Sequence, residues 1–284
     1  MARRSKPKGK LSWKVVVLAI GLLVAGYVWP PFGALIDQVL GTNLFDGATA
    51  SRTEQTDLGY DEVDLAGLPN TPSSFSEAKR LLYDEVYRGQ RITFYCGCDF
   101  DRDRDINPRS CAYRTRANAE RADRVEAEHV FPASQFGQQR ACWRDDLCER
   151  TDGSRFGGRS CCERIDPVFQ RAHNDLHNLV PSVGEVNGDR SNYNWGMIEG
   201  EARNYGACNF EVASSLRRAE PPEDRMGDIA RIYFYMADTY GLRLSDQDRQ
   251  LYTAWSNQDP VDDAERERNE RIFKIQGNRN PYIR

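Results

Sequence analysis

Residues 127–132 place a carboxylate directly beside an imidazole, because Glu128 is followed by His129, one of only three histidines in the chain. A second polar stretch, residues 174–192, contains Asn187. A neutral imidazole can take a proton from an attacking water, and one carboxylate with one amide oxygen can hold a Mg²⁺ ion that keeps several waters. Such a cation offsets charge on a phosphate. We therefore expect the two stretches to fold against each other around one divalent cation and to hydrolyse nucleic-acid phosphodiesters.

The second stretch is predicted to form a strand, a turn and a helix. Residues 176–180 are interpreted as a strand whose side chains alternate between two faces. Pro181 then favours a turn, and Ser182 can cap a short helix that carries Asn187 and Arg190. This arrangement would place Asn187 on a helix packed beside the strand.

Glu128 and His129 raise a geometric question, because neighbours on a regular strand point to opposite faces. If both residues act at one site, the backbone is expected to bend at or just before them, with Pro132 closing the irregular segment. A flat strand through both residues would leave only one of them at the site.

Other polar residues near the site have alternative interpretations. Asn178 could supply the amide ligand in place of Asn187. His177 is interpreted as structural, and Asp189 with Arg190 as a local salt bridge or turn rather than a catalytic pair.

Composition describes a soluble globular protein, with 39% hydrophobic and 29% charged residues in 284. The net charge of −4 gives no overall attraction to nucleic acid, so a nucleic-acid partner requires a local basic surface. Five arginines of the loop-rich region are candidates, although each could equally belong to a solvated surface of mixed charge: Arg140, Arg144, Arg155, Arg159 and Arg164.

The N-terminus combines basic residues with an apolar run from Val15 to Trp29. The run is shorter than the roughly 20 residues of most spanning helices, so residues 1–29 are predicted as a signal peptide or an N-terminal membrane anchor. A buried N-terminal helix is the alternative. Residues 30–70 are predicted as a tether, and the positive-inside rule places everything after Trp29 outside the cytoplasm.

Eight cysteines support an oxidising, extracytoplasmic compartment, where disulfides are the expected state. Adjacent Cys161 and Cys162 are expected to bridge two other segments rather than each other. A zinc cluster is the alternative, but the spacing lacks a pair of Cys-x-x-Cys units.

Helices are predicted at both ends of the remaining chain. Residues 71–89 form the first, with Ser73 or Ser74 as the cap. The C-terminal third is predicted to contain three helices, bounded by these signals: Gly241 as a stop, Ser245 as a cap, Asp259-Pro260 as an opening turn and Gly277 as a stop.

From residue 71 to the C-terminus the sequence closely resembles the endonuclease I family of periplasmic and secreted nucleases, of the His-Me finger (ββα-metal) type. The resemblance is carried by several blocks in the same order: residues 128–133, 135–137, 139–143, 158–159, 175–179, 184–192 and 276–281. It implies an α+β fold for residues 71–284, with a ββα-metal core surrounded by helices and disulfide-stapled loops.

The resemblance also implies roles for individual residues. His129 would be the general base, Glu128 and Asn187 would bind one Mg²⁺ or a similar ion such as Mn²⁺ or Ca²⁺, and Arg159 would stabilise the phosphate. The implied reaction is largely sequence-independent cleavage of double- and single-stranded DNA, with RNA as a further substrate, by a monomer that leaves 5′-phosphates. His173 stands where many members carry a glutamate, which puts a supporting role of that side chain in doubt.

Two other classes of function are weighed against this hypothesis. A disulfide-rich extracytoplasmic binding module could retain the nuclease fold without activity, but Glu128, His129 and Asn187 are all present. A metalloprotease is disfavoured because no His-Glu-x-x-His motif occurs.

Overall fold

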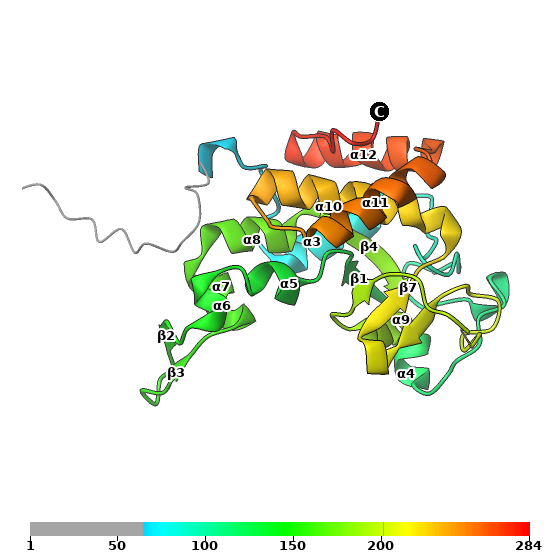
Figure 1. The fold of residues 1–284 in the computed structure, drawn as a ribbon, viewed down its shortest axis with the longest axis horizontal. Helices are drawn as coiled ribbons and strands as arrows, with labels where there is room; N and C mark the ends of the chain where they lie inside the picture. The colour runs from blue at the N-terminus through cyan, green and yellow to red at the C-terminus, as the bar shows by residue number, and fades with distance from the viewer. Residues whose placement is uncertain (1–64, 201) are drawn as a thin grey trace, which may run out of the picture. The chain divides into compact units, whose positions relative to one another are not determined.

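The computed structural model describes residues 65–200 and 202–284 (Figure 1). The predicted signal peptide or anchor at residues 1–29 and most of the predicted tether lie outside these residues. Within them, no helix is both long enough and apolar enough to cross a membrane. The described end of the tether contacts the domain, since Leu68 is buried and the Pro69 carbonyl accepts a hydrogen bond from Arg171 at 2.6 Å.

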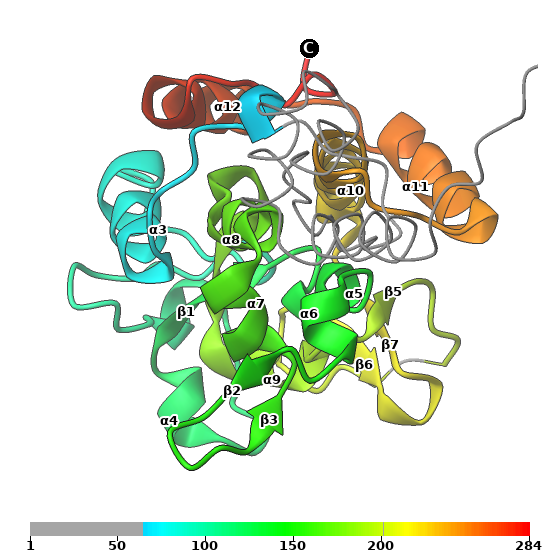
Figure 2. The same cartoon turned by 90° about the vertical axis from the view of Figure 1, so that its left-hand side faces the viewer.

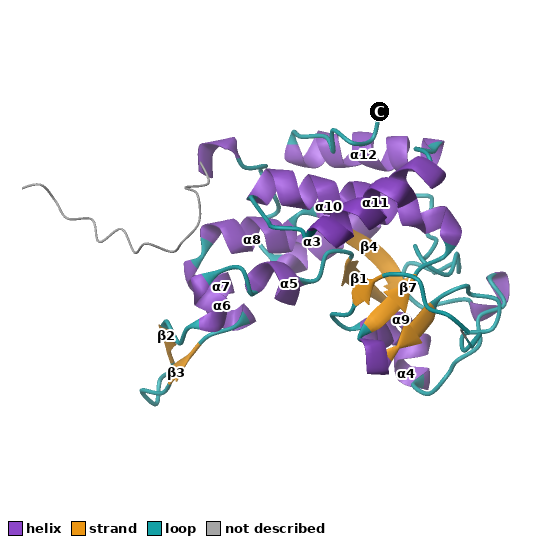
Figure 3. Ribbon diagram, viewed as in Figure 1, coloured by secondary structure: helices purple, strands orange, loops and turns teal. Residues whose placement is uncertain are grey.

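The described residues form ten α-helices and seven short strands, which confirms the predicted α+β class (Figure 3). The helices are α3 (Phe75–Leu81), α4 (Ala119–Ala122), α5 (Ala133–Gly137), α6 (Ala141–Arg144), α7 (Arg159–Ile165), α8 (Pro167–Asn174), α9 (Gly184–Arg190), α10 (Met226–Tyr240), α11 (Asp246–Gln258) and α12 (Asp263–Gln276). The strands are β1 (Val125–His129), β2 (Cys148–Glu149), β3 (Arg155–Phe156), β4 (Leu179–Val183), β5 (Asn194–Trp195), β6 (Glu211–Ala213) and β7 (Arg218–Glu220).

A two-stranded ribbon followed by a helix carries the predicted site. β1 pairs with β4 in antiparallel register, from Val125↔Val183 to His129↔Leu179, and β4 runs directly into α9. Helix α9 lies below the ribbon and helices α10 to α12 lie above it, as the views of Figures 1 and 2 agree. This is the ββα arrangement that the sequence predicts for the core.

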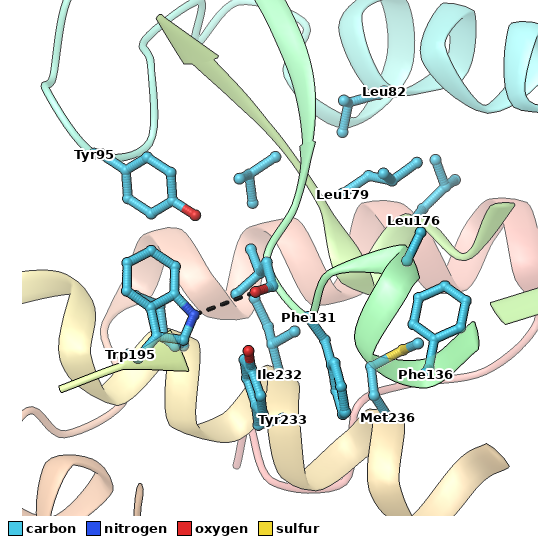
Figure 4. Packing of buried hydrophobic residues seen from close by; sticks show 14 of the residues in the cluster. Leu82, Tyr95, Phe131, Phe136, Leu176, Leu179, Trp195, Ile232, Tyr233 and Met236 are labelled. Atoms are coloured by element: carbon cyan, nitrogen blue, oxygen red, sulfur yellow. Dashed lines mark hydrogen bonds between the residues drawn. The ribbon is translucent and has the colours of Figure 1, made fainter. Parts of the chain in front are cut away.

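Apolar side chains of the ribbon and of α10 meet in one cluster (Figure 4). Leu179 and Val180 of β4 are fully buried. Phe131, just beyond β1, stacks on Tyr233 of α10 with ring centroids 4.3 Å apart. The helical layer therefore covers the face of the ribbon that α9 leaves open.

The predicted course of residues 176–190 needs correction. Residues 176–178 form a 3₁₀ turn, the strand begins at Leu179, and Pro181 lies within it opposite Ala127 instead of forming a turn. Pro181 is tolerated because its side of β4 faces away from β1, where its carbonyl accepts a hydrogen bond from Phe94 N at 2.7 Å. Ser182 does not cap α9, because its hydroxyl donates to the Val183 carbonyl.

The other helix boundaries largely follow the sequence signals. Ser74 caps α3, which continues into a π-helical turn at Leu82–Val86. Ser245 caps α11, and Gly241 and Gly277 end α10 and α12 in the left-handed conformation. The third C-terminal helix does not open at Asp259-Pro260, however. It begins at Asp263, because the Asp262 carboxylate accepts from Glu265 N and caps it.

All eight cysteines form disulfides, as expected, and no free cysteine remains. The pairs are Cys96–Cys208, Cys98–Cys111, Cys142–Cys162 and Cys148–Cys161. The adjacent Cys161 and Cys162, both on α7, are joined to two other segments, which excludes the alternative of a zinc cluster at these thiols.

Asp175 connects the ribbon to the C-terminal helices. Its buried carboxylate accepts hydrogen bonds from the hydroxyls of Tyr235 and Tyr240, both at 2.6 Å. It also accepts from His177 N at 2.8 Å and from the Gln276 amide at 2.9 Å. These four donors replace the water that a buried carboxylate loses, so they allow α10 and α12 to close over the start of β4.

His177 is fully buried beside this carboxylate, and it should make the fold sensitive to acid. Burial lowers the pKa of His177 to about 4, although Asp175 opposes the shift. The unfolded chain then binds the extra proton below pH ~6.5 while the folded one does not, so stability present at pH 7 is lost as the pH falls. We expect His177→Gln to remove up to about 2 kcal/mol of the stability difference between pH 7 and pH 5. Urea denaturation of both proteins at pH 7 and pH 5 measures this difference in the free energy of unfolding. If His177→Gln keeps the pH dependence of the wild type, His177 is not its cause.

Candidate active site

The four residues predicted to do the chemistry line one pocket. Glu128 and His129 come from the end of β1, Asn187 from α9 and Arg159 from the first position of α7. All four border a cavity of about 450 Å³. The fold thus unites three segments that the sequence predicts to cooperate.

Two neighbouring strand residues border this pocket, which lies beside the edge of β1 that pairs with no strand among the described residues. Ala127, Glu128 and His129 all line the cavity, and β1 is hydrogen-bonded to β4 on one side only. A cavity beside a free edge can border side chains from both faces of a strand. The predicted bend at or just before Glu128 is therefore wrong. The strand stays paired through His129, and the chain turns only at residues 130–131.

The Asn178 amide holds the turn that follows β1. Its Oδ1 accepts from Phe131 N at 2.8 Å and its Nδ2 donates to Phe131 O at 2.9 Å. Val130 N donates to the main-chain carbonyl of Asn178 at 3.0 Å. Asn178 is fully buried and committed to the main chain, so the alternative that it replaces Asn187 as a metal ligand does not fit this geometry.

The position of the proton on His129 follows from its hydrogen bond. Nε2 lies 2.8 Å from the carbonyl oxygen of His173, and a carbonyl oxygen can only accept, so Nε2 carries the proton and Nδ1 keeps a lone pair. Burial, together with the charges of Arg159 and Arg190, lowers the pKa of His129 to about 4, against the opposing effect of the His173 carbonyl. At neutral pH the residue is a neutral imidazole, the form that a general base requires.

His173 supports His129 through its main chain and its ring. Because the acceptor is a main-chain carbonyl, the bond to His129 does not depend on which side chain stands at position 173, so the glutamate expected there from the resemblance is not required for it. The two imidazoles stack with centroids 4.7 Å apart, and Phe75 stacks on both. Nε2 of His173 lies 3.1 Å from Glu163, and burial lowers the pKa of His173 to about 2, so this contact joins a neutral ring to a carboxylate.

Glu128 is held by a buried arginine that the sequence alone does not assign to it. Nη1 of Arg190 donates to Oε1 of Glu128 at 2.9 Å, and the Tyr95 hydroxyl lies 3.4 Å from the same oxygen. Burial raises the pKa of Glu128 to about 7, while Arg190 and Tyr95 oppose the rise. Of the two interpretations offered for Asp189 and Arg190, the local salt bridge is wrong, because Asp189 binds Arg116 at 2.6 Å instead.

Arg190 also fixes the main chain around the predicted base. Nη1 donates to His129 O at 2.9 Å and Nη2 to Val130 O at 2.6 Å. The guanidinium lies 4.4 Å from the centroid of the Trp195 ring, and the indole N–H donates to Val130 O at 3.2 Å (Figure 4). One fully buried side chain therefore holds the predicted metal ligand and the end of β1 together.

A carboxylate on β1 orients the side chain of Asn187, which lies on α9. Its Nδ2 donates to Oε2 of Glu126 at 3.1 Å, which directs the amide so that Oδ1 remains available. Glu126 is in turn bound by Arg121 and Arg124. Gly188 leaves room for the Arg121 guanidinium, because a Cβ there would lie 2.0 Å from its Nη1.

Arg159 is the only one of the five candidate arginines that borders the pocket. It opens α7 directly after Gly158, whose φ of +84° favours glycine. Both disulfides of α7 hold this helix against α6 and β2. Arg140 is instead buried in an ion pair with Asp166 at 2.6 Å, so the predicted basic surface is smaller than expected.

The donor set fits a small, hard cation. Among the described residues, no protein group hydrogen-bonds to Oε2 of Glu128 or to Oδ1 of Asn187, and both residues border the cavity. No group of three or more His, Cys, Asp or Glu side chains in the described ranges is placed to hold a metal. One carboxylate oxygen and one amide oxygen suit an ion such as Mg²⁺ that keeps most of its waters, and do not suit zinc.

Sequence reasoning missed three residues that build this site. Tyr95 and Glu126 contact the predicted ligands, and Arg190 pairs with Glu128. Glu126 carried a signal, because it lies two residues before Glu128 on the same strand and so shares its face. No sequence signal pointed to Tyr95 or Arg190, since both contact Glu128 from positions far away in the chain.

A model of the endonuclease I family matches residues 74–284. The chain belongs to the endonuclease I family. It is 44% identical over 214 residues to an extracellular deoxyribonuclease of Aeromonas hydrophila, covering 74% of this chain and 87% of that protein. It is 43% identical over 228 residues to a periplasmic deoxyribonuclease of the same organism, covering 77% and 91%. It is 40% identical over 216 residues to Endonuclease-1 of Buchnera aphidicola, covering 75% and 81%.

This membership makes the chain an endonuclease and agrees with the predicted family. Relatives named extracellular or periplasmic, together with four disulfides, establish an extracytoplasmic location.

Removing Arg190 should cost far more stability than removing a surface arginine. Arg190→Met would leave the Glu128 carboxylate buried without its partner, and we expect a loss of about 3–5 kcal/mol in the free energy of unfolding. In the control Arg116→Met, the lost pair with Asp189 has side chains 43% and 21% exposed, so we expect about 0–1 kcal/mol. Denaturant unfolding of both variants measures the difference, and equal losses would contradict the role of Arg190.

Proposed function

We propose that this protein is a divalent-metal-dependent endonuclease that hydrolyses DNA with little sequence preference, accepts RNA as a second substrate and leaves 5′-phosphate ends. His129 is the general base, Glu128 and Asn187 hold one Mg²⁺, Mn²⁺ or Ca²⁺ ion, and Arg159 binds the phosphate. The observation that carries the proposal is the convergence on a single pocket of one imidazole, two free oxygen ligands and Arg159, the one lining arginine without an ion pair among the described residues.

His129 acts through the nitrogen that its hydrogen bond leaves free. The His173 carbonyl holds the proton on Nε2, so Nδ1 takes the proton of an attacking water. The stacked rings of Phe75 and His173 keep the imidazole in one orientation, which lowers the entropic cost of placing the base.

Charge on the phosphate is offset from two directions. The Arg159 guanidinium, which forms no ion pair among the described residues, is available to a phosphate oxygen. A cation bound by Glu128 and Asn187 would polarise the phosphate as a Lewis acid. Arg190 holds the Glu128 carboxylate at the edge of the pocket, where it can bind that ion.

The names of the relatives support DNA as the substrate, since two of those described above are called deoxyribonucleases. The rival hypothesis, a binding module that keeps the fold without activity, would not need an imidazole with a free Nδ1 beside two oxygen atoms that no described protein group binds. The geometry of the pocket therefore favours an enzyme.

Cleavage of DNA should depend on a divalent cation. The purified domain, incubated with supercoiled plasmid and Mg²⁺, is expected to nick and then linearise it, and EDTA should stop the reaction. Added Mg²⁺ should restore it, because the oxygen ligands bind the ion reversibly. Gel electrophoresis follows the products, and their ligation without prior phosphorylation tests for 5′-phosphates. Absence of cleavage with Mg²⁺, Mn²⁺ and Ca²⁺ would refute the proposed function.

Replacing the general base should abolish most activity without unfolding the protein. We expect His129→Ala to lower kcat by about 10²–10⁴-fold. Circular dichroism should show an intact fold, because Arg190 and Asn178 hold the strand end through main-chain atoms. His177→Gln, which alters a histidine outside the pocket, is the matched control and should keep nearly full activity at pH 8. Cleavage by His129→Ala at the rate of the control would exclude His129 as the base.

A further inference from the structure

Arg217 lies beside the pocket, next to the lining residue Asn192, and is outside the set assigned to the chemistry. Asn192 lines the cavity, and its Oδ1 accepts a hydrogen bond from Nη2 of Arg217 at 3.1 Å. The Arg217 guanidinium lies 5.2 Å from the centroid of the Tyr193 ring. Arg217 is exposed, and no carboxylate of the described residues forms an ion pair with it.

The main chain presents this guanidinium at some conformational cost. Arg217 has φ 49° and ψ 47°, a left-handed conformation that residues other than glycine seldom adopt. Of the four non-glycine residues with positive φ in residues 65–200 and 202–284, two lie at this rim, Ser191 and Arg217. Such backbone outliers concentrate at functional sites, where the surrounding structure maintains them.

Hydrogen bonds hold the main chain of the rim in place. Gln135 donates to the Asn192 carbonyl at 3.1 Å and to Oδ1 of Asn194 at 2.8 Å. Asn194 N in turn donates to the Arg217 carbonyl at 3.2 Å, where β5 pairs with β7. The next residue of β5, Trp195, packs on Arg190 beneath the active site. The main chain of Arg217 is therefore fixed in position relative to the pocket through β5.

The chemistry of this group suits a phosphate. A guanidinium offers several N–H donors in one plane and binds phosphate oxygens through two of them. Asn192 is neutral and uses only one donor, so the charge of Arg217 remains uncompensated. In a chain of net charge −4, a nucleic-acid backbone can be attracted only by such local charge.

We propose that Arg217, supported by Asn192 and Tyr193, is a second phosphate contact of this endonuclease and binds the nucleic-acid backbone at a phosphate flanking the scissile one. The inference rests on the proposed function and extends it, because it assigns a binding residue that acts outside the reacting group. Contacts of this kind raise affinity without reading bases, which agrees with cleavage of many sequences.

The test compares Arg217→Ala with the wild type on a defined DNA duplex in Mg²⁺, measuring KM and kcat over a range of salt. We expect KM to rise roughly tenfold, as for the loss of one charge-assisted hydrogen bond, with kcat changed less than about twofold. The slope of log KM against log salt should fall by about 1. Tyr193→Leu removes the ring but no charge, so it should raise KM less and keep the salt slope.

Arg249→Ala, an exposed arginine on α11 that does not border the pocket, is the matched control and should leave both constants unchanged. An Arg217→Ala enzyme with the KM and salt slope of this control would overturn the assignment while leaving the proposed function intact. A fall in kcat at constant KM would also overturn it, since Arg217 would then act on the reaction rather than on binding. A wild-type protein that cleaves no DNA would refute the proposed function and this inference with it.

Discussion

Arg190 places its guanidinium inside the protein, where it binds the Glu128 carboxylate and the carbonyl oxygens of His129 and Val130. Removing two charges from water is costly, and the cost is offset only when geometry and hydrogen bonding are good. Here the pair is almost without exposure, at 0% and 4% of the two side chains. The end of β1 therefore cannot shift without breaking this pair.

That constraint explains how the site can be assembled on a single short strand. The ribbon has two strands only, so no strand among the described residues pairs with the outer edge of β1, and the pocket lies beside that edge. Arg190 and Asn178 hold the main chain on either side of the turn after β1. Glu128 and His129 can then serve the same pocket from opposite faces, each with its own partners.

The rest of the chain positions groups around this edge. Disulfides on α7 place Arg159 at the pocket, and β5 with β7 carries Arg217 to its rim. Glu126 of β1 orients the Asn187 amide of α9. The predicted catalytic groups from distant segments are thus held by short, cross-linked elements, which is how a protein with few long strands can keep a precise site.

Much of the site was predictable because its chemistry is local in the sequence. Glu128-His129, Asn187 and Arg159 were identified from residue type and family resemblance, and the structure places all four at one pocket. The caps at Ser74 and Ser245 were also predictable, because a cap bonds to an amide three residues away. Pro181 misled the prediction, since its missing N–H faces away from the partner strand and a strand can accept it there.

The sequence by itself determined the family, the α+β class, the oxidised state of the cysteines and the identity of the predicted catalytic groups, because these depend on residue type, spacing and motif order. Only the tertiary structure decided that Arg190 pairs with Glu128 rather than Asp189, that a main-chain carbonyl supports His129, and that the chain turns after β1. The physical reason is that these interactions join residues far apart in the chain, and burial selects among partners that the sequence leaves equally available.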